Sequence, residues 1–439
     1  MDRHVRLGVA AVASPLEVGA GDAPALQERL GALFSGIDSD RLTLFLAGQT
    51  VSDPASAVAT GRAFYDQRVD AICVVAASWY EDYLVLDMLE ECPVPLIGWG
   101  RPGMETGSLC GMQQLGFMMK QLEQPFCALF EPVDSQVGLQ RAWDYARAAA
   151  LKRGLRRARI GYLGHRVEGM TETTPHELAL KRAFGPRVVG IDSKVFLDQA
   201  AAVPVDSVRT AWQTVREQVG RVTSTEDAGL ESMQVYQTLK ALVDDAGLSA
   251  VAVGCYPHLM GKVCLAASLL GEQGTPVACE GDVNGALGML MLSELSGEPV
   301  HNTDLLDPVP ADNAIVYSHC GSGAFSLACE SCGITLGPVR LMDQGLCALF
   351  LPRTGRVTLV NIVPGLGGYR VAAIAGEAVA TDMVFPGNPL KVRFDADYQA
   401  VLEWIADEGL GHHWMAAYGD LCRPLKDLAG MVECEWVAL

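Results

Sequence analysis

Two acidic residues, Glu280 and Asp282, interrupt an apolar stretch of the chain, residues 277–292, which reads VACEGDVNGALGMLML. Apolar residues recur at helical spacing after Asp282, so this residue is expected at a helix N-cap. A carboxylate held where a strand meets a helix is also a common metal ligand or general base. This stretch alone leaves both roles open for Asp282.

Histidines outside this stretch are the other candidates for chemistry. His412 and His413 stand together in a turn near the carboxyl end, His319 follows a β-leaning run, and His258 follows an apolar strand pattern. Adjacent histidines in a strand would point to opposite faces, so we expect at most one of the pair at a given site. A histidine in a loop is more often solvated or structural than a ligand, and that alternative stays open for each of them.

The elements that would position these residues change in kind along the chain. Strand and helix patterns alternate through residues 1–150 and 151–304, and Val69–Ala76 is a continuous apolar run of the kind buried in a parallel sheet. From about residue 305, short β-leaning runs are separated by Gly, Pro and Asn. We therefore predict an α/β protein with two doubly wound domains, 1–150 and 151–304, the second carrying the acidic motif. A mostly antiparallel, barrel-like β domain, 305–439, with the His-His pair and a terminal helix would follow.

Composition narrows the possible partners. The chain has 439 residues and a formal net charge of -19, which argues against nucleic acid as the main partner. No apolar run reaches membrane length and no signal peptide is evident, so we expect a cytoplasmic protein without a membrane partner. Thirteen cysteines are scattered through the chain, many in apolar runs, and we expect free thiols, including the Cys329 and Cys332 pair.

An ordered set of motifs carries a family resemblance. Three of them are Cys279-Glu-Gly-Asp-Val-Asn-Gly-Ala-Leu, Ser318-His-Cys-Gly and Gly411-His-His-Trp-Met-Ala-Ala-Tyr-Gly-Asp. Pro95-Leu-Ile-Gly-Trp-Gly and Cys110-Gly-Met-Gln-Gln precede them. The set resembles the L-fucose isomerase and L-arabinose isomerase-like superfamily over nearly the whole chain.

The resemblance implies a metal-dependent aldose–ketose isomerase. Such enzymes use a divalent metal, usually Mn²⁺, to polarise the sugar carbonyl and its neighbouring hydroxyl, and a carboxylate moves a proton between two carbons through an ene-diol. Carried over by position, Asp282 would be a metal ligand and the acid/base, and His413 a metal ligand. Glu280 would be a supporting carboxylate or a substitute base. Independently of the resemblance, His319 is a candidate substrate contact because it ends a β run before a Gly-rich loop, and we expect Asn284 to be another.

The resemblance also implies an assembly and exposes one departure. Family members are trimers or hexamers with sites at subunit contacts, so Gln113 and Trp99 would serve the site of a neighbouring copy. The family's metal site has a further Glu before the Asp motif, yet residues 247–271 contain no acid. His258 is then the remaining candidate ligand from that segment.

Two other functions stay open at this point. Without a second carboxylate, the chain could be a non-catalytic sugar-binding or regulatory relative. It could also apply the same metal ene-diolate chemistry to the cleavage or transfer of a carbon–carbon bond. The sugar itself, whether plain, phosphorylated or sulfonated, is open as well.

Overall fold

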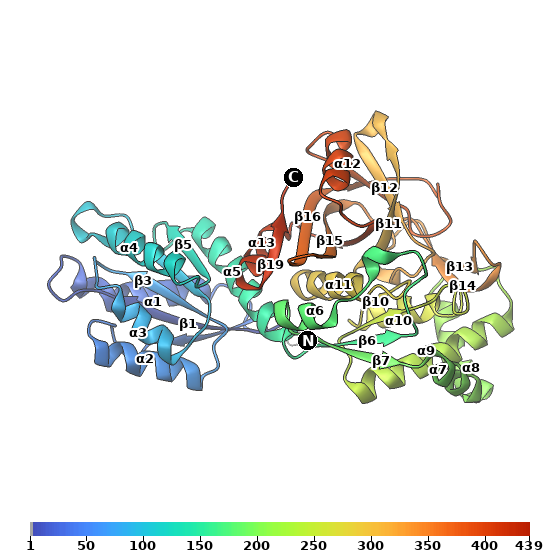
Figure 1. The fold of residues 1–439 in the computed structure, drawn as a ribbon, viewed down its shortest axis with the longest axis horizontal. Helices are drawn as coiled ribbons and strands as arrows, with labels where there is room; N and C mark the ends of the chain where they lie inside the picture. The colour runs from blue at the N-terminus through green and yellow to red at the C-terminus, as the bar shows by residue number, and fades with distance from the viewer. Residues whose placement is uncertain (1–2) are drawn as a thin grey trace. The chain divides into compact units, whose positions relative to one another are not determined.

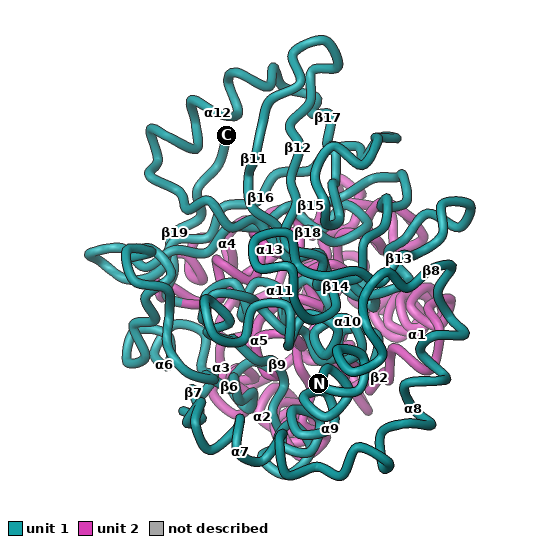
Figure 2. Tube along the Cα trace, turned by 90° about the vertical axis from the view of Figure 1, so that its right-hand side faces the viewer, with its two compact units in different colours: residues 1, 155–422, 433–439 teal, residues 2–154, 423–432 magenta. Residues whose placement is uncertain are grey.

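The computed structural model describes residues 3–439, which form two compact units (Figure 2). The N-terminal unit consists of the described residues up to Gly154 together with a later segment, Arg423–Val432. The main unit comprises Leu155–Cys422 and Glu433–Leu439. The central and C-terminal segments of the sequence thus share one unit. The division into three domains at residues 150 and 304 stays a prediction.

The N-terminal unit is built on a five-stranded parallel sheet in the order β2-β1-β3-β4-β5. This is the order of doubly wound sheets, in which the chain winds outward in both directions from the first strand. All six residues of β3 are buried, as its continuous apolar run predicts. The elements are β1 Val5–Val12, α1 Ala23–Phe34, β2 Leu42–Leu46, α2 Pro54–Asp66, β3 Ala71–Ala76, α3 Tyr83–Glu91, β4 Leu96–Gly100, α4 Ser108–Gln121, β5 Phe126–Phe130 and α5 Gln136–Leu155.

A helix from the far end of the chain completes this unit. Most of α13, Cys422–Met431, falls in the N-terminal unit, where Asp427 forms an ion pair of 2.5 Å with Arg141 of α5. The Asp427 side chain is buried, so the arginine supplies the partner that a buried carboxylate requires. The chain therefore crosses back to its first unit before it ends.

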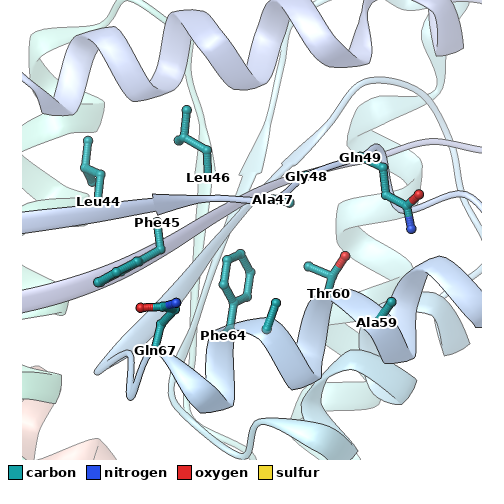
Figure 3. Close-up of a pocket in the computed structure, with 11 residues that line it drawn as sticks. Leu44, Phe45, Leu46, Ala47, Gly48, Gln49, Ala59, Thr60, Phe64 and Gln67 are labelled. Carbon is teal, nitrogen blue, oxygen red and sulfur yellow. The ribbon is translucent and has the colours of Figure 1, made fainter.

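The edge strand β2 borders a cavity of about 580 Å³ (Figure 3). Leu44 and Leu46 point to one side of the strand, and Phe45 points to the other, where Phe64 and Gln67 lie. The lining is apolar apart from backbone, one threonine and two glutamines, and it contains no carboxylate, imidazole or thiol. This cavity therefore offers no acid–base or metal chemistry.

The main unit begins with a second parallel sheet, in the order β10-β9-β6-β7 (Figure 1). Counted along the chain this is again a doubly wound order, with the reversal between β6 and β9. Helices α7, α9 and α10 supply apolar residues to its core. The elements are β6 Arg159–Leu163, α6 Glu177–Ala183, β7 Arg187–Ile191, α7 Ser193–Ala202, α8 Val205–Glu217, α9 Glu226–Ala246, β9 Ala250–Val253, α10 Cys264–Glu272, β10 Val277–Ala278 and α11 Val283–Ser296.

A closed antiparallel barrel of six strands follows in the same unit. Its order is β15-β18-β11-β12-β17-β16, and pairing of β16 with β15 closes the ring, while β19 adds to β16 in parallel. Parallel α/β sheets followed by an antiparallel barrel confirm the architecture predicted from the sequence. The elements are β11 His301–Val309, β12 Ala314–Ser318, β15 Gly355–Gly365, β16 Gly368–Val379, β17 Leu390–Phe394, α12 Tyr398–Asp407, β18 His413–Tyr418 and β19 Cys434–Val437.

A third, smaller sheet joins β14 Gln344–Leu349, β13 Thr335–Val339 and β8 Arg221–Val222. Beside it, Cys329 and Cys332 form a disulfide, so the expectation of free thiols at this pair was wrong. A turn in which the Cys332 amide donates to the Cys329 carbonyl brings the two side chains together. Among residues 3–439, no helix is both long and apolar enough to cross a bilayer.

Helix α11 connects the sheet of the main unit to the barrel. It packs against β9 on one side and against β15 and β18 on the other (Figure 1). Twelve of its fourteen residues are buried, which explains why its sequence is apolar all round rather than amphipathic. Asp282 caps its first turn as predicted, because the side chain accepts a hydrogen bond of 2.8 Å from the Gly285 amide.

Candidate active site

The site centres on His413, the first residue of β18, and Asp282, the cap of α11. His413 Nδ1 donates to Asp282 Oδ2 at 2.8 Å, although 131 positions separate the two residues in the chain. Both side chains are about 95% buried. Packing of α11 against β18 brings the two residues together. Because the Asp282 carboxylate holds Nδ1, the other ring nitrogen, Nε2, is left for further contacts.

Glu280 contacts the other nitrogen of the same ring. Its Oε2 lies 3.1 Å from His413 Nε2, and its backbone adopts a left-handed conformation with φ of +62°. Gly281 follows with φ of +73°, so two consecutive left-handed residues turn the chain from β10 into α11. This turn directs Glu280 and Asp282 to opposite nitrogens of one imidazole.

These contacts set the charges of the side chains at the site. Burial opposes the charged form of His413, but the hydrogen bonds to Asp282 and Glu280 outweigh it and raise the pKa of His413 to about 10. Burial likewise disfavours the Glu280 carboxylate, yet His413 and the nearby histidines hold the pKa of Glu280 below its ordinary value. Glu280 is therefore ionised at neutral pH and can act as a base.

The register of the barrel strands places a third acid, Asp304 of β11, at the site. Asp304 stands opposite His413 in the β11–β18 pairing and opposite Ser318 in the β11–β12 pairing. Its Oδ1 lies 3.4 Å from His413 Nε2, and this buried oxygen accepts no hydrogen bond from the described residues. A buried carboxylate oxygen that lies beside two imidazole nitrogens without a hydrogen bond is a suitable ligand for a cation.

His319, at the end of β12, completes the buried part of the cluster. Its ligand atom lies within 4.8 Å of those of Glu280 and His413. The Cys320 amide donates to His319 Nδ1 at 2.8 Å, so the ring proton sits on Nε2, which has no hydrogen-bond partner among residues 3–439. Burial disfavours the charged ring, but Asp304 and the neighbouring thiols outweigh it and raise the pKa of His319 above its ordinary value. Nε2 carries a proton whether the ring is neutral or charged. His319 is thus a hydrogen-bond donor aimed into the cluster.

His412 lies at the same site, contrary to the expectation that only one of the two adjacent histidines could. The rings of His412 and His413 are 4.2 Å apart between centroids, and both belong with Asp304 to a group of possible metal ligands. The alternation of a strand does not apply to this pair because β18 begins only at His413. His412 Nδ1 contacts Glu172 Oε1 at 2.7 Å, and both side chains are more than a third exposed.

The other predicted residues lie in three different places. Asn284 lies two residues after Asp282 in the first turn of α11, where its side-chain oxygen accepts a hydrogen bond of 3.0 Å from the Tyr369 hydroxyl. His258 is exposed in the loop between β9 and α10 and belongs to neither group of possible metal ligands. Trp99 and Gln113 belong to the N-terminal unit, where Trp99 is fully buried with its indole N–H on the Glu131 carbonyl, and Gln113 is exposed.

Sequence reasoning missed two acids, Glu172 and Asp304. Glu172 lies in the loop between β6 and α6, a segment whose sequence has no chemical motif. Asp304 ends the run His301-Asn-Thr-Asp, in which the first three residues are buried although all are polar. A polar run at the start of a strand was the one available signal for Asp304.

No protein-family model matches the chain. Among curated proteins, sulfoquinovose isomerase from Alkalicoccus urumqiensis is 24% identical over 370 residues, which is 82% of this chain and 84% of the relative. Sulfoquinovose isomerase from Priestia megaterium (strain ATCC 12872 / QMB1551) is 23% identical over 379 residues, with 84% and 85% covered. A protein of the same name from Clostridium sp. (strain MSTE9) is 24% identical over 349 residues, with 78% of each chain covered.

Solved structures offer only distant likenesses. A solute-binding protein of an ABC transporter from Rhodopseudomonas palustris BisB5 gives a TM-score of 0.20 at 12% identity, over 72% of this chain and 69% of that chain. A solute-binding protein from Burkholderia multivorans gives 0.19 at 10% identity, over 67% and 95%. Scores at this level support no argument about fold or function.

Proposed function

We propose that the chain is a metal-dependent aldose–ketose isomerase of a sulfonated sugar, sulfoquinovose or a close analogue. The enzyme class, a sugar isomerase, is supported by several similar curated proteins, all named sulfoquinovose isomerase. The name of these relatives is also the support for a sulfonated substrate. The observation that supports metal dependence and proton transfer is the convergence of Glu280, Asp282 and Asp304 on His413, because it supplies the carboxylates that residues 247–271 lack.

The residues fit a divalent cation, with Glu280, Asp304 and His413 as the groups that would hold it. Asp282 fixes His413 with Nε2 toward the two other acids, which is the usual arrangement of a metal-binding histidine. Carboxylate oxygens with one imidazole nitrogen suit Mn²⁺. In this proposal Asp282 positions the ligand histidine, a different role from the ligand and acid/base role that the resemblance implies, and His258 takes no part.

A bound cation would polarise the sugar carbonyl and the hydroxyl beside it. The chain's own groups would then move the protons. Glu280, ionised at neutral pH, is our candidate for the base that removes the proton on the carbon beside the carbonyl and returns it to the carbonyl carbon. His319 Nε2–H would donate to a substrate oxygen. His412, oriented by Glu172, would exchange the hydroxyl proton near the exposed side of the site.

The test is turnover of sulfoquinovose to its ketose, followed by NMR. Protein stripped with a chelator should be inactive and should recover with Mn²⁺. Glu280→Gln should lower kcat at least about 1,000-fold, since it removes both the base and one of the groups that would hold the cation. Glu217→Gln, on an exposed position of α8, is the matched control and should keep full activity. Sugar binding without turnover in the Mn²⁺-loaded protein would overturn the proposal in favour of a non-catalytic relative.

Our proposal includes a homotrimer or homohexamer, as the resemblance implies. In such an assembly the exposed Gln113 could face a neighbouring copy, whereas Trp99 would act only through packing, since it is buried. Light scattering on a sizing column measures the mass directly. A monomer at working concentrations would contradict this part of the proposal and leave the chemistry of the main unit unaffected.

A further inference from the structure

We propose that Arg166 binds the sulfonate of the substrate and so selects sulfonated over plain sugars. The inference rests on the proposed function, because it assigns the charged end of the substrate to a subsite of the same site. A sulfonate is ionised at every physiological pH. The site itself is rich in acids, including Glu172, Glu280 and Asp304, and the whole chain has a net charge of -19. A sulfonate therefore needs a local cation to enter.

Arg166 stands where the topology predicts a ligand. It follows β6, whose neighbour β9 marks the reversal of strand order in the sheet of the main unit. Ligands of doubly wound sheets bind at the carboxyl ends of the strands beside such a reversal. The acidic turn with Glu280 follows β10 at the same edge. Arg166 and the proposed base thus extend from the same edge of one sheet.

Backbone contacts hold Arg166 against that turn. The Val167 amide donates to the Glu280 carbonyl at 3.2 Å, and the Arg166 amide donates to the Tyr162 hydroxyl at 2.7 Å. Gly281 packs so closely that a Cβ there would lie 2.7 Å from the Arg166 Cα. The residue that carries the guanidinium is therefore a direct neighbour of Glu280 rather than a part of a loose loop.

The guanidinium is available for an anion. Its Nη1 donates to the Val167 carbonyl at 3.0 Å, and no carboxylate within residues 3–439 pairs with it. The side chain is half-buried, which strengthens a charge-assisted hydrogen bond relative to open solvent. Nε and Nη2 are left to form the planar fork that suits two oxygens of a sulfonate. A lysine would supply the charge from a single nitrogen, without the two parallel N–H bonds of the planar fork.

The experiment compares Arg166→Met and Arg166→Lys with Arg157→Met, the matched control. Arg157 is exposed and forms no ion pair or side-chain hydrogen bond within residues 3–439. It lies just before the opposite end of β6, so its loss changes the net charge equally. Arg166→Met should lower kcat/KM for sulfoquinovose about 100-fold and leave any slow isomerisation of glucose unchanged, while Arg166→Lys should lose less. Arg157→Met should match the unmodified protein on both sugars. Equal losses on both sugars in Arg166→Met would overturn the inference.

A binding measurement separates this inference from the proposed function. Calorimetry with sulfoquinovose and with glucose, in the presence of a chelator, reports recognition without catalysis. If the protein binds sulfoquinovose and Arg166→Met does not, the subsite stands even where no sugar is turned over. If the enzyme isomerises sulfoquinovose and Arg166→Met binds it equally well, the subsite is refuted while the isomerase survives. Thermal unfolding of each variant shows that it is folded.

Discussion

Asp282→Asn separates the two roles that Asp282 combines. One carboxylate oxygen caps α11 through the Gly285 amide and the other holds His413 Nδ1, both at 2.8 Å. Asparagine keeps an oxygen for the cap, and it is as good a cap as aspartate. It presents an amide donor to His413 instead of an acceptor, so the ring must carry its proton on Nε2, where a cation would bind.

We expect Asp282→Asn to lower the affinity of the site for a metal ion rather than the stability of the fold. Loss of a supporting carboxylate costs a metal site about 10- to 100-fold in affinity, or about 1.4 to 2.7 kcal/mol. Asp282→Ala should lose the same affinity and, in addition, about 1 kcal/mol of unfolding free energy with the cap. Titration calorimetry with Mn²⁺ and urea unfolding of the metal-free protein measure the two quantities independently.

Asp192→Asn is the control, because Asp192 caps α7 through the Val195 amide and forms no hydrogen bond or ion pair with a histidine within residues 3–439. It should change neither Mn²⁺ affinity nor stability beyond a few tenths of a kcal/mol. Mn²⁺ affinity of Asp282→Asn within threefold of the unmodified protein would refute the positioning role of Asp282. A loss of stability equal to that of Asp282→Ala would refute the separation of cap from site.

Three further predictions concern the titration of His301, the backbone at Gly281 and the hydroxyl group of Tyr369. Burial lowers the pKa of His301 to about 3, whereas the pKa of a histidine in the unfolded chain is about 6.5, so between these values only the unfolded chain takes up the proton. The unfolding free energy should therefore fall by about 2 kcal/mol between pH 7 and pH 5. His301→Leu should not show this part of the pH dependence. Gly281→Ala should cost about 2 kcal/mol and at least tenfold in kcat/KM, because a Cβ at φ +73° would strike Arg166; wild-type kinetics and stability would contradict the packing of that turn. Tyr369→Phe should cost about 1 kcal/mol in urea unfolding, because the hydroxyl donates to Asn284 and accepts from the His176 amide, and an unchanged midpoint would count against both bonds.

Local pattern was sufficient for several helices and strands in both units. The periodicity of the sequence predicts strands Val5–Val12 and Leu42–Leu46 with the bounds that the structure shows. It also predicts Asp282 as the cap of a helix and a β-rich segment after residue 305. Each of these depends on residues a few positions apart, and short-range sterics and side-chain periodicity decide them without the rest of the chain.

Long-range contacts decided the composition of the site. Asp304 joins His413 only through the register of β11 against β18, and a shift of one residue would turn its side chain to the other face. Glu172 reaches His412 across 240 positions because a loop of the α/β sheet lies beside the barrel. No local pattern encodes such a meeting, since it depends on how whole elements pack. The sequence by itself determined which residues could bind a metal or move a proton, and the tertiary structure decided which of them meet.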